Sequence, residues 1–279
     1  MCLKNRKIKL MSNYRIYGRS PYSIIVVHGG PGAAGEMKPV AEELSQFFGV
    51  IEPIQTKDSI KGQIDELKEV IERNASIPVI LIGWSWGAWL SYFFAAKYPK
   101  LVKKLVLVSS GPFEESYAQQ IMPTKLSRLS QQERVKASEI IGLLQSGQIN
   151  EEIFNEFGQL MDKADSFKTI PHKNEYSLGL DKNSQSKIYE KVWSEAEQLR
   201  KTGELLEMGK TITCSVVAIH GDYDSHPAKG VSKPLASALH DFKFVLLKNC
   251  GHHPWFEQEA KDKFYDLLRS EISAILRNS

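Results

Sequence analysis

Residues 78–98 of the chain read PVILIGWSWGAWLSYFFAAKY, and the fold class can be inferred from this sequence. It opens with the short apolar run 78–82, which is typical of a strand buried in a parallel sheet. The run leads into the glycine-bounded turn GWSWG at 83–87. Residues 88–98 then have the composition of a helix, which Pro99 closes. A strand, a sharp turn and a helix in direct succession indicate one unit of an α/β fold.

Similar units recur on both sides of this stretch. Further apolar, β-branched runs predict strands at 23–27, 50–54, 105–108, 215–219 and 243–247. Apolar residues at helical spacing predict helices at 35–48, 59–73 and 257–277, the second of them with Ser59 as its N-cap. The alternation predicts an α/β fold with a mostly parallel central sheet flanked by helices.

The strand pattern is interrupted between residues 113 and 210. This segment has helical periodicity and no comparable strand, and it carries 16 acidic and 13 basic residues. We therefore expect residues 1–112 and 211–279 to form one core, with 113–210 inserted as a helical cap or lid. The cap is mildly acidic, whereas the whole chain carries +3. Solvated helix faces explain this difference as well as a preference for ammonium-bearing substrates does.

The composition limits the partners. The 279 residues include 36 basic and 33 acidic ones, a balance that argues against nucleic acid and against a membrane partner. Three cysteines are too few for a disulfide framework and fit a reducing compartment, so we expect a cytoplasmic protein. The expected partner is a small-molecule or short peptide substrate, and the composition leaves the oligomeric state open.

The turn at 83–87 has the form G-x-S-x-G, which places Ser85 at the carboxyl end of a strand and the start of a helix. This arrangement is that of a nucleophile elbow, in which a strained serine projects its hydroxyl above the sheet edge. The alternative is an ordinary turn with a capping serine. Trp84 and Trp86 either line a pocket or pack beside the turn.

An oxyanion hole needs preorganised N–H donors. One donor is the residue after the nucleophile, here Trp86. The other is expected in the loop HGGPG at 28–32, and we choose Gly30. The competing interpretation of this loop as a phosphate cradle lacks the residues of a P-loop or a dinucleotide site. His28 is expected to form structural hydrogen bonds at the base of the loop.

A serine nucleophile also needs a base and an orienting carboxylate, in the chain order Ser, Asp or Glu, His. The loop after the strand 215–219 offers Asp224, with Asp222 as the alternative. The loop after 243–247 offers His252, with His253 as the alternative. We expect no metal, because no paired histidine or cysteine motif completes a site, and no cofactor.

Together these residues resemble the α/β-hydrolase superfamily over residues 14–112 and 211–275. The HGGPG loop and the G-x-S-W-G elbow look like the proline iminopeptidase branch. The resemblance implies a triad of Ser85, Asp224 and His252 and a cap over the active site. It departs at Trp84, where that branch usually has glycine.

Acidic cap residues hold the substrate's amino group in that branch. Trp84 and Glu195 are our predicted substrate-binding residues, and the other acidic candidates are Glu114, Glu115, Glu197 and Glu204. The resemblance implies a serine hydrolase that acts as an aminopeptidase. The alternatives are a carboxylesterase with the same triad and a noncatalytic binding protein of the same fold.

Overall fold

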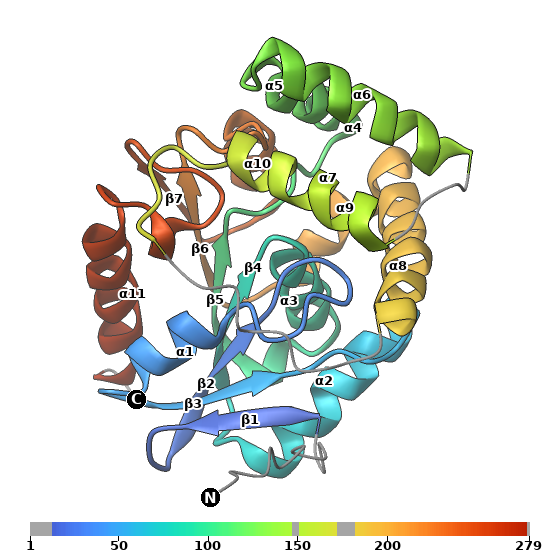
Figure 1. The fold of residues 1–279 in the computed structure, drawn as a ribbon. Helices are drawn as coiled ribbons and strands as arrows, with labels where there is room; N and C mark the ends of the chain where they lie inside the picture. The colour runs from blue at the N-terminus through green and yellow to red at the C-terminus, as the bar shows by residue number, and fades with distance from the viewer. Residues whose placement is uncertain (1–12, 147–150, 172–181, 278–279) are drawn as a thin grey trace, which may run out of the picture.

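A seven-stranded sheet forms the centre of the computed structural model, which describes residues 13–146, 151–171 and 182–277 (Figure 1). The strands lie in the order β1-β3-β2-β4-β5-β6-β7. All neighbouring strands are parallel except β1 and β3, which pair antiparallel. The strands are β1 (Tyr14–Tyr17), β2 (Tyr22–Val27), β3 (Gly49–Pro53), β4 (Val79–Trp84), β5 (Val102–Val108), β6 (Ser215–Gly221) and β7 (Phe242–Leu247).

Helices cover both faces of this sheet. Each strand sends alternate side chains to opposite faces, so neighbours such as Ile80 and Leu81 belong to two different apolar clusters. One cluster includes α2 (Ile60–Asn74), α3 (Trp86–Lys97) and α10 (Lys229–Ala238). The other includes α1 (Lys38–Leu44) and α11 (Lys261–Leu276). Burial of both faces explains why the central strands are continuously apolar.

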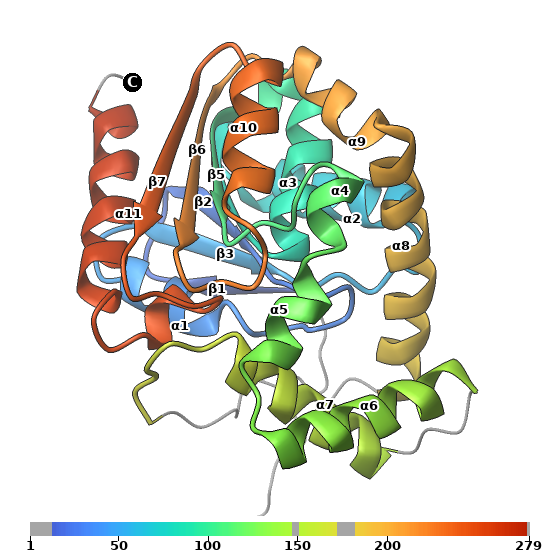
Figure 2. The same ribbon diagram turned by 90° about the horizontal axis from the view of Figure 1, so that it is seen from above.

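In the sequence, further helices come after β5 and before β6 (Figure 2). They are α4 (Glu115–Ala118), α5 (Ile121–Ser127), α6 (Gln131–Gln145), α7 (Glu151–Ala164), α8 (Lys182–Thr202) and α9 (Glu204–Glu207). The α8 side chains Ile188, Val192 and Ala196 join the core cluster of α2 and α3. By contrast, α6 and α7 share a small cluster of their own and lie away from the sheet (Figure 2). Short 3-10 turns are η1 (Pro99–Leu101), η2 (Met208–Thr211) and η3 (Pro254–Phe256).

The fold class predicted from the sequence is confirmed. Every predicted strand is present within a residue or a few of its expected bounds, and Ser59 Oγ caps α2 by accepting a hydrogen bond from Gly62 N at 3.1 Å. The prediction missed β1 and α10, and the helix expected at 35–48 is limited to α1.

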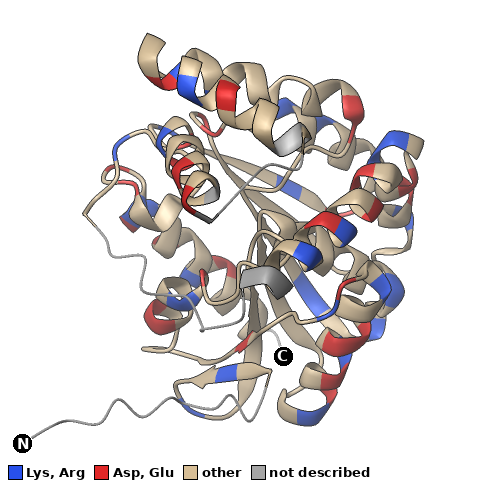
Figure 3. Ribbon diagram, turned by 45° about the vertical axis from the view of Figure 1, so that its right-hand side comes forward, with Lys and Arg blue, Asp and Glu red and all other residues tan. Residues whose placement is uncertain are grey.

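Basic and acidic residues are interspersed over the helices (Figure 3), in keeping with the near-neutral net charge. Among the residues that the structure describes, none of the helices combines the length and apolarity of a membrane span.

Candidate active site

The turn between β4 and α3 holds Ser85 in a strained backbone conformation, with φ 53° and ψ −116°. Its flanking glycines are required by close backbone approaches. A Cβ on Gly83 would lie 2.1 Å from the carbonyl oxygen of Gly87, and one on Gly87 would lie 2.3 Å from that of Val27. The chain can therefore turn this sharply only with glycine at both positions, and the turn places Ser85 at the carboxyl end of the sheet.

His252 connects Ser85 to Asp224. Its Nε2 lies 3.1 Å from Ser85 Oγ, and its Nδ1 lies 2.8 Å from Asp224 Oδ2. The side chain of Asp224 is fully buried and that of His252 is 9% exposed, so the carboxylate is shielded from water. With the Nδ1 proton directed at the carboxylate, Nε2 is left to accept a proton from the serine. The structure thus brings the three predicted residues into one hydrogen-bonded chain.

The two alternatives lie elsewhere. Asp222 Oδ1 accepts a hydrogen bond from Cys250 N at 3.4 Å, and Asp222 Oδ2 lies 3.4 Å from Lys248 Nζ. The ring of His253 packs on Trp84, with centroids 4.5 Å apart. Geometry therefore favours Asp224 over Asp222, and His252 over the neighbouring histidine.

Electrostatics within this group favour an ion pair. Burial lowers the pKa of His252, but the charge and the hydrogen bond of Asp224 outweigh burial and raise this pKa above its ordinary value. Burial raises the pKa of Asp224, yet the neighbouring imidazoles, His252 foremost, hold it well below its ordinary value. Asp224 is thus an anion, and the protonated form of His252 is stabilised beside it.

The predicted oxyanion donors belong to two turns, each of which follows a strand of the sheet. Trp86 is the first residue of α3, where the backbone N–H has no acceptor within the helix. Gly30 adopts φ 32° in the loop after β2, a conformation that favours glycine. The loop rests on His28, whose Nδ1 lies 2.9 Å from Gly29 O and whose Nε2 accepts from Gln55 N at 3.2 Å. Burial lowers the pKa of His28 to about 4, so this imidazole is neutral and structural.

Comparison with known proteins identifies the family of the chain. A family model described as the α/β hydrolase fold matches residues 22–259. The chain belongs to the α/β-hydrolase fold family. It is 23% identical over 287 residues to a proline iminopeptidase of Saccharolobus solfataricus, covering 94% of this chain and 88% of the relative.

Solved structures of the α/β-hydrolase fold are also similar. VinJ has a TM-score of 0.68 at 15% identity, and each chain is covered to 94%. A proline iminopeptidase of Mycobacterium smegmatis has a TM-score of 0.60 at 15% identity, again with 94% of each chain covered. At these identities the likeness shows a shared fold.

Trp84 packs against the loop that follows β7, residues 248–253, called here the histidine loop. Its indole N–H donates to the carbonyl oxygen of His252 at 2.9 Å, and its ring packs edge-on against Trp255 at a centroid distance of 5.2 Å. The residue is 4% exposed. The position that is usually glycine in proline iminopeptidases thus carries a buried side chain that supports His252. We therefore do not propose that Trp84 contacts the substrate.

Glu195, on α8, accepts a hydrogen bond from the N-terminus of α2. Its Oε2 accepts a hydrogen bond from Ile60 N at 2.9 Å, in the first turn of α2. The remaining acidic candidates include Glu115, which accepts from Arg200 Nε at 2.9 Å, and Glu197, which lies 3.2 Å from Lys201 Nζ. These carboxylates therefore have partners within the protein, and we do not propose Glu195 as a ligand of the substrate.

Glu36, which follows the HGGPG loop, was not among the predicted site residues. The residue is half-buried and lies within electrostatic reach of both Asp162 on α7 and His252. Burial, and then the charge of Asp162, raise the pKa of Glu36 to about 8. Its position four residues after the HGGPG loop is the only sequence signal that points to it.

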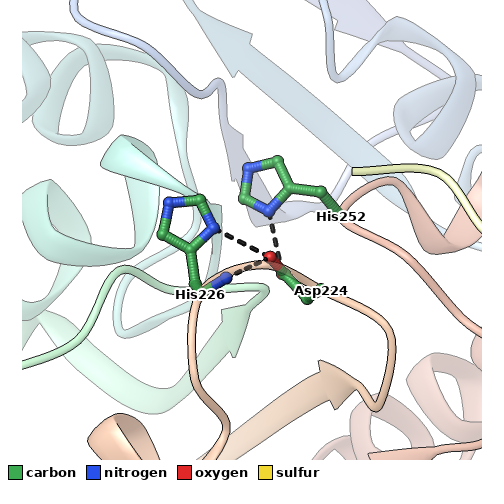
Figure 4. A group of neighbouring side chains, drawn as sticks. All are labelled: Asp224, His226 and His252. Carbon is green, nitrogen blue, oxygen red and sulfur yellow. Dashed lines mark hydrogen bonds and ion pairs between the residues drawn. The ribbon is translucent and has the colours of Figure 1, made fainter. Parts of the chain in front are cut away.

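Asp224, His226 and His252 lie close enough together to be considered as metal ligands (Figure 4). However, the contacts within the group are those of hydrogen bonds. His226 Nδ1 lies 2.8 Å from Asp224 Oδ1, while His252 Nδ1 lies 2.8 Å from the other carboxylate oxygen. Since both Nδ1 atoms already face the carboxylate at this distance, we propose no metal at this position.

Proposed function

We propose that this chain is a serine hydrolase that cleaves ester or amide bonds through an acyl-enzyme. The observation that carries the proposal is the continuous contact from Ser85 Oγ through His252 to Asp224, at 3.1 and 2.8 Å. His252 Nε2 takes the hydroxyl proton as Oγ attacks the substrate's carbonyl carbon. Asp224 holds the imidazole in the required orientation and stabilises the cation that forms.

The oxyanion of the tetrahedral intermediate would be held by the backbone N–H groups of Gly30 and Trp86. One such donor lowers the barrier by roughly 3 kcal/mol in related chemistry. When the intermediate collapses, the ester or amide bond breaks and His252 gives its proton to the leaving group. Water then attacks the acyl-enzyme and passes a proton to His252. Release of the acid returns that proton to Ser85.

We further propose a substrate with a free amino group, which would make the enzyme an aminopeptidase of the proline iminopeptidase kind. Glu36 is the carboxyl group that supports this assignment, because it lies within electrostatic reach of His252. A substrate ammonium near Glu36 would lower the pKa of that carboxyl from about 8, so the bound pair would be ionic at neutral pH. The similarity to a proline iminopeptidase supports the same class.

We infer that residues 113–210 act as the cap of this site. The segment that follows α7 contacts the histidine loop, since Asp165 O accepts a hydrogen bond from His252 N at 2.9 Å. Lys125 of α5 pairs with the Asp165 carboxylate. The cap therefore reaches the proposed base through the backbone.

Carboxylesterase activity is the second candidate. It is favoured by the hydrogen bond that Glu195 accepts at the N-terminus of α2, because this bond occupies one predicted ligand of a substrate ammonium group. An esterase would need only the elbow, the oxyanion donors and an apolar acyl site.

Steady-state kinetics on aminoacyl arylamides of proline, alanine and leucine, and on p-nitrophenyl acetate, test these proposals. The wild type should turn over at least one class and Ser85→Ala neither. Glu36→Gln should raise KM for arylamides and leave the acetate ester unchanged, with the exposed Glu42→Gln as the matched control. Ester turnover without arylamide turnover would defeat the aminopeptidase assignment, and turnover that survives in Ser85→Ala would defeat the hydrolase.

A further inference from the structure

A second imidazole contacts the carboxylate of Asp224. His226 donates to Asp224 Oδ1 from its backbone N at 2.9 Å, and its ring Nδ1 lies 2.8 Å from the same oxygen. The other oxygen, Oδ2, faces His252. The two carboxylate oxygens are thus divided between two histidines, one of which has no place in the mechanism above.

The two imidazoles form a stacked pair. Their centroids are 4.6 Å apart with 26° between the ring planes, and in Figure 4 both rings direct Nδ1 at Asp224 and Nε2 away from it. The side chain of His226 is 14% exposed, close to the 9% of His252, so the pair covers the fully buried carboxylate.

His226 is itself held in place. Its carbonyl oxygen lies 2.8 Å from Nε2 of His220, which is fully buried on β6, and Pro227 follows it in the chain. Because the backbone is fixed at this point, the His226 ring keeps its position over Oδ1. A side chain that only filled space would not need an Nδ1 directed at the carboxylate.

We infer that His226 is a positioning residue for the proposed hydrolysis, which fixes Asp224 through Oδ1 so that Oδ2 remains directed at His252. The inference rests on the proposed serine hydrolase function. By donating to Oδ1, His226 also draws part of the carboxylate's charge away from His252 and so moderates the basicity of that residue. The other titratable groups acting on this network are Asp165, Lys125, Glu36 and His220, whose Nε2 lies 3.7 Å from Asp224 Oδ2.

The test compares three variants of His226. His226→Asn keeps an N–H donor near the Nδ1 position, His226→Phe keeps a ring without the donor, and His226→Ala keeps neither. The backbone hydrogen bond to Oδ1 is available in all of them. We expect kcat of His226→Phe and His226→Ala to fall about tenfold or more with KM unchanged, the effect of losing a hydrogen bond to a charged group. The kcat of His226→Asn should stay within about threefold of wild type, since its donor is retained.

The pH profile separates positioning from packing. Without the ring donor to Oδ1, Asp224 stabilises protonated His252 more strongly, so the acid limb of kcat/KM should move to higher pH in His226→Phe and His226→Ala and stay in place in His226→Asn. Equal losses in all three variants with an unshifted limb would overturn the inference, as would full activity in His226→Phe. Thermal unfolding of each variant controls for folding.

Labelling by a fluorophosphonate keeps the two proposals distinct. An unlabelled Ser85 in the wild type would sink the proposed function itself. If the wild type is labelled, and His226→Phe and His226→Ala match it in kcat and pH profile, only the role of His226 is overturned.

Discussion

A buried carboxylate ties the cap segment to the histidine loop. Glu257 is 1% exposed, and its Oε1 accepts hydrogen bonds from Gly251 N at 2.9 Å and from Phe167 N at 2.8 Å. Its Oε2 accepts from Lys168 N at 2.8 Å. Gly251 precedes the proposed base, so one side chain joins the base's loop to residues 167–168 of the inserted segment.

We predict that Glu257→Gln destabilises the chain by about 2 to 4 kcal/mol. The amide oxygen can replace Oε1, but the amide NH2 then faces Lys168 N, which loses its acceptor. Losing one hydrogen bond to a charged group costs about 1.5 to 3 kcal/mol, and the two remaining bonds weaken when the acceptor becomes neutral. For a chain of this size that loss lowers Tm by roughly 5 to 15 °C.

Thermal and urea unfolding followed by circular dichroism measure this effect. Glu259→Gln is the matched control, since Glu259 is exposed and accepts only from Asn249 Nδ2 at 2.6 Å within the described chain. The control should change stability by no more than about 0.5 kcal/mol. If Glu257→Gln were as stable as this control, the carboxylate would not join the two segments and our reasoning would be refuted.

Three further predictions concern the site. Trp84→Phe removes the hydrogen bond to His252 O and should lower kcat roughly two- to tenfold, whereas unchanged kcat would contradict a supporting role. The protonated imidazole of His252 cannot accept a proton, so its raised pKa places the acid limb of kcat/KM above the ordinary value of about 6.5. Asp224→Asn should move that limb to lower pH and reduce kcat about 10³- to 10⁴-fold. Gly83→Ala puts a Cβ 2.1 Å from Gly87 O and should abolish fluorophosphonate labelling; retained labelling would show that the elbow tolerates a side chain there.

Much of the fold could be predicted because its signals are local. The central strands are buried on both faces and are therefore continuously apolar, and the GWSWG turn has little choice of conformation once both glycines are packed against backbone. Ser85, Asp224 and His252 were found by their positions after successive strands, since the carboxyl ends of parallel strands meet at one sheet edge. The structure brings these side chains together, and their catalytic roles remain predictions.

The features that could not be predicted from the sequence depend on contacts between distant segments. The strand β1 is a polar-flanked edge strand whose pairing with β3 leaves no apolar run in the sequence. Glu195 caps a helix that precedes it by 135 positions, and Trp84 donates to a carbonyl 168 positions later. The division of the Asp224 carboxylate between His226 and His252 is likewise visible only once the loop is folded.

Active-site labelling shows whether Ser85 is an activated nucleophile. The intact chain is treated with a fluorophosphonate and digested, and the modified residue is located by mass spectrometry. We predict a single adduct on Ser85, lost in Ser85→Ala and slowed strongly in His252→Ala, while both variants keep the wild-type Tm within a few degrees. An unlabelled wild type, or an adduct that persists in Ser85→Ala, would contradict the account.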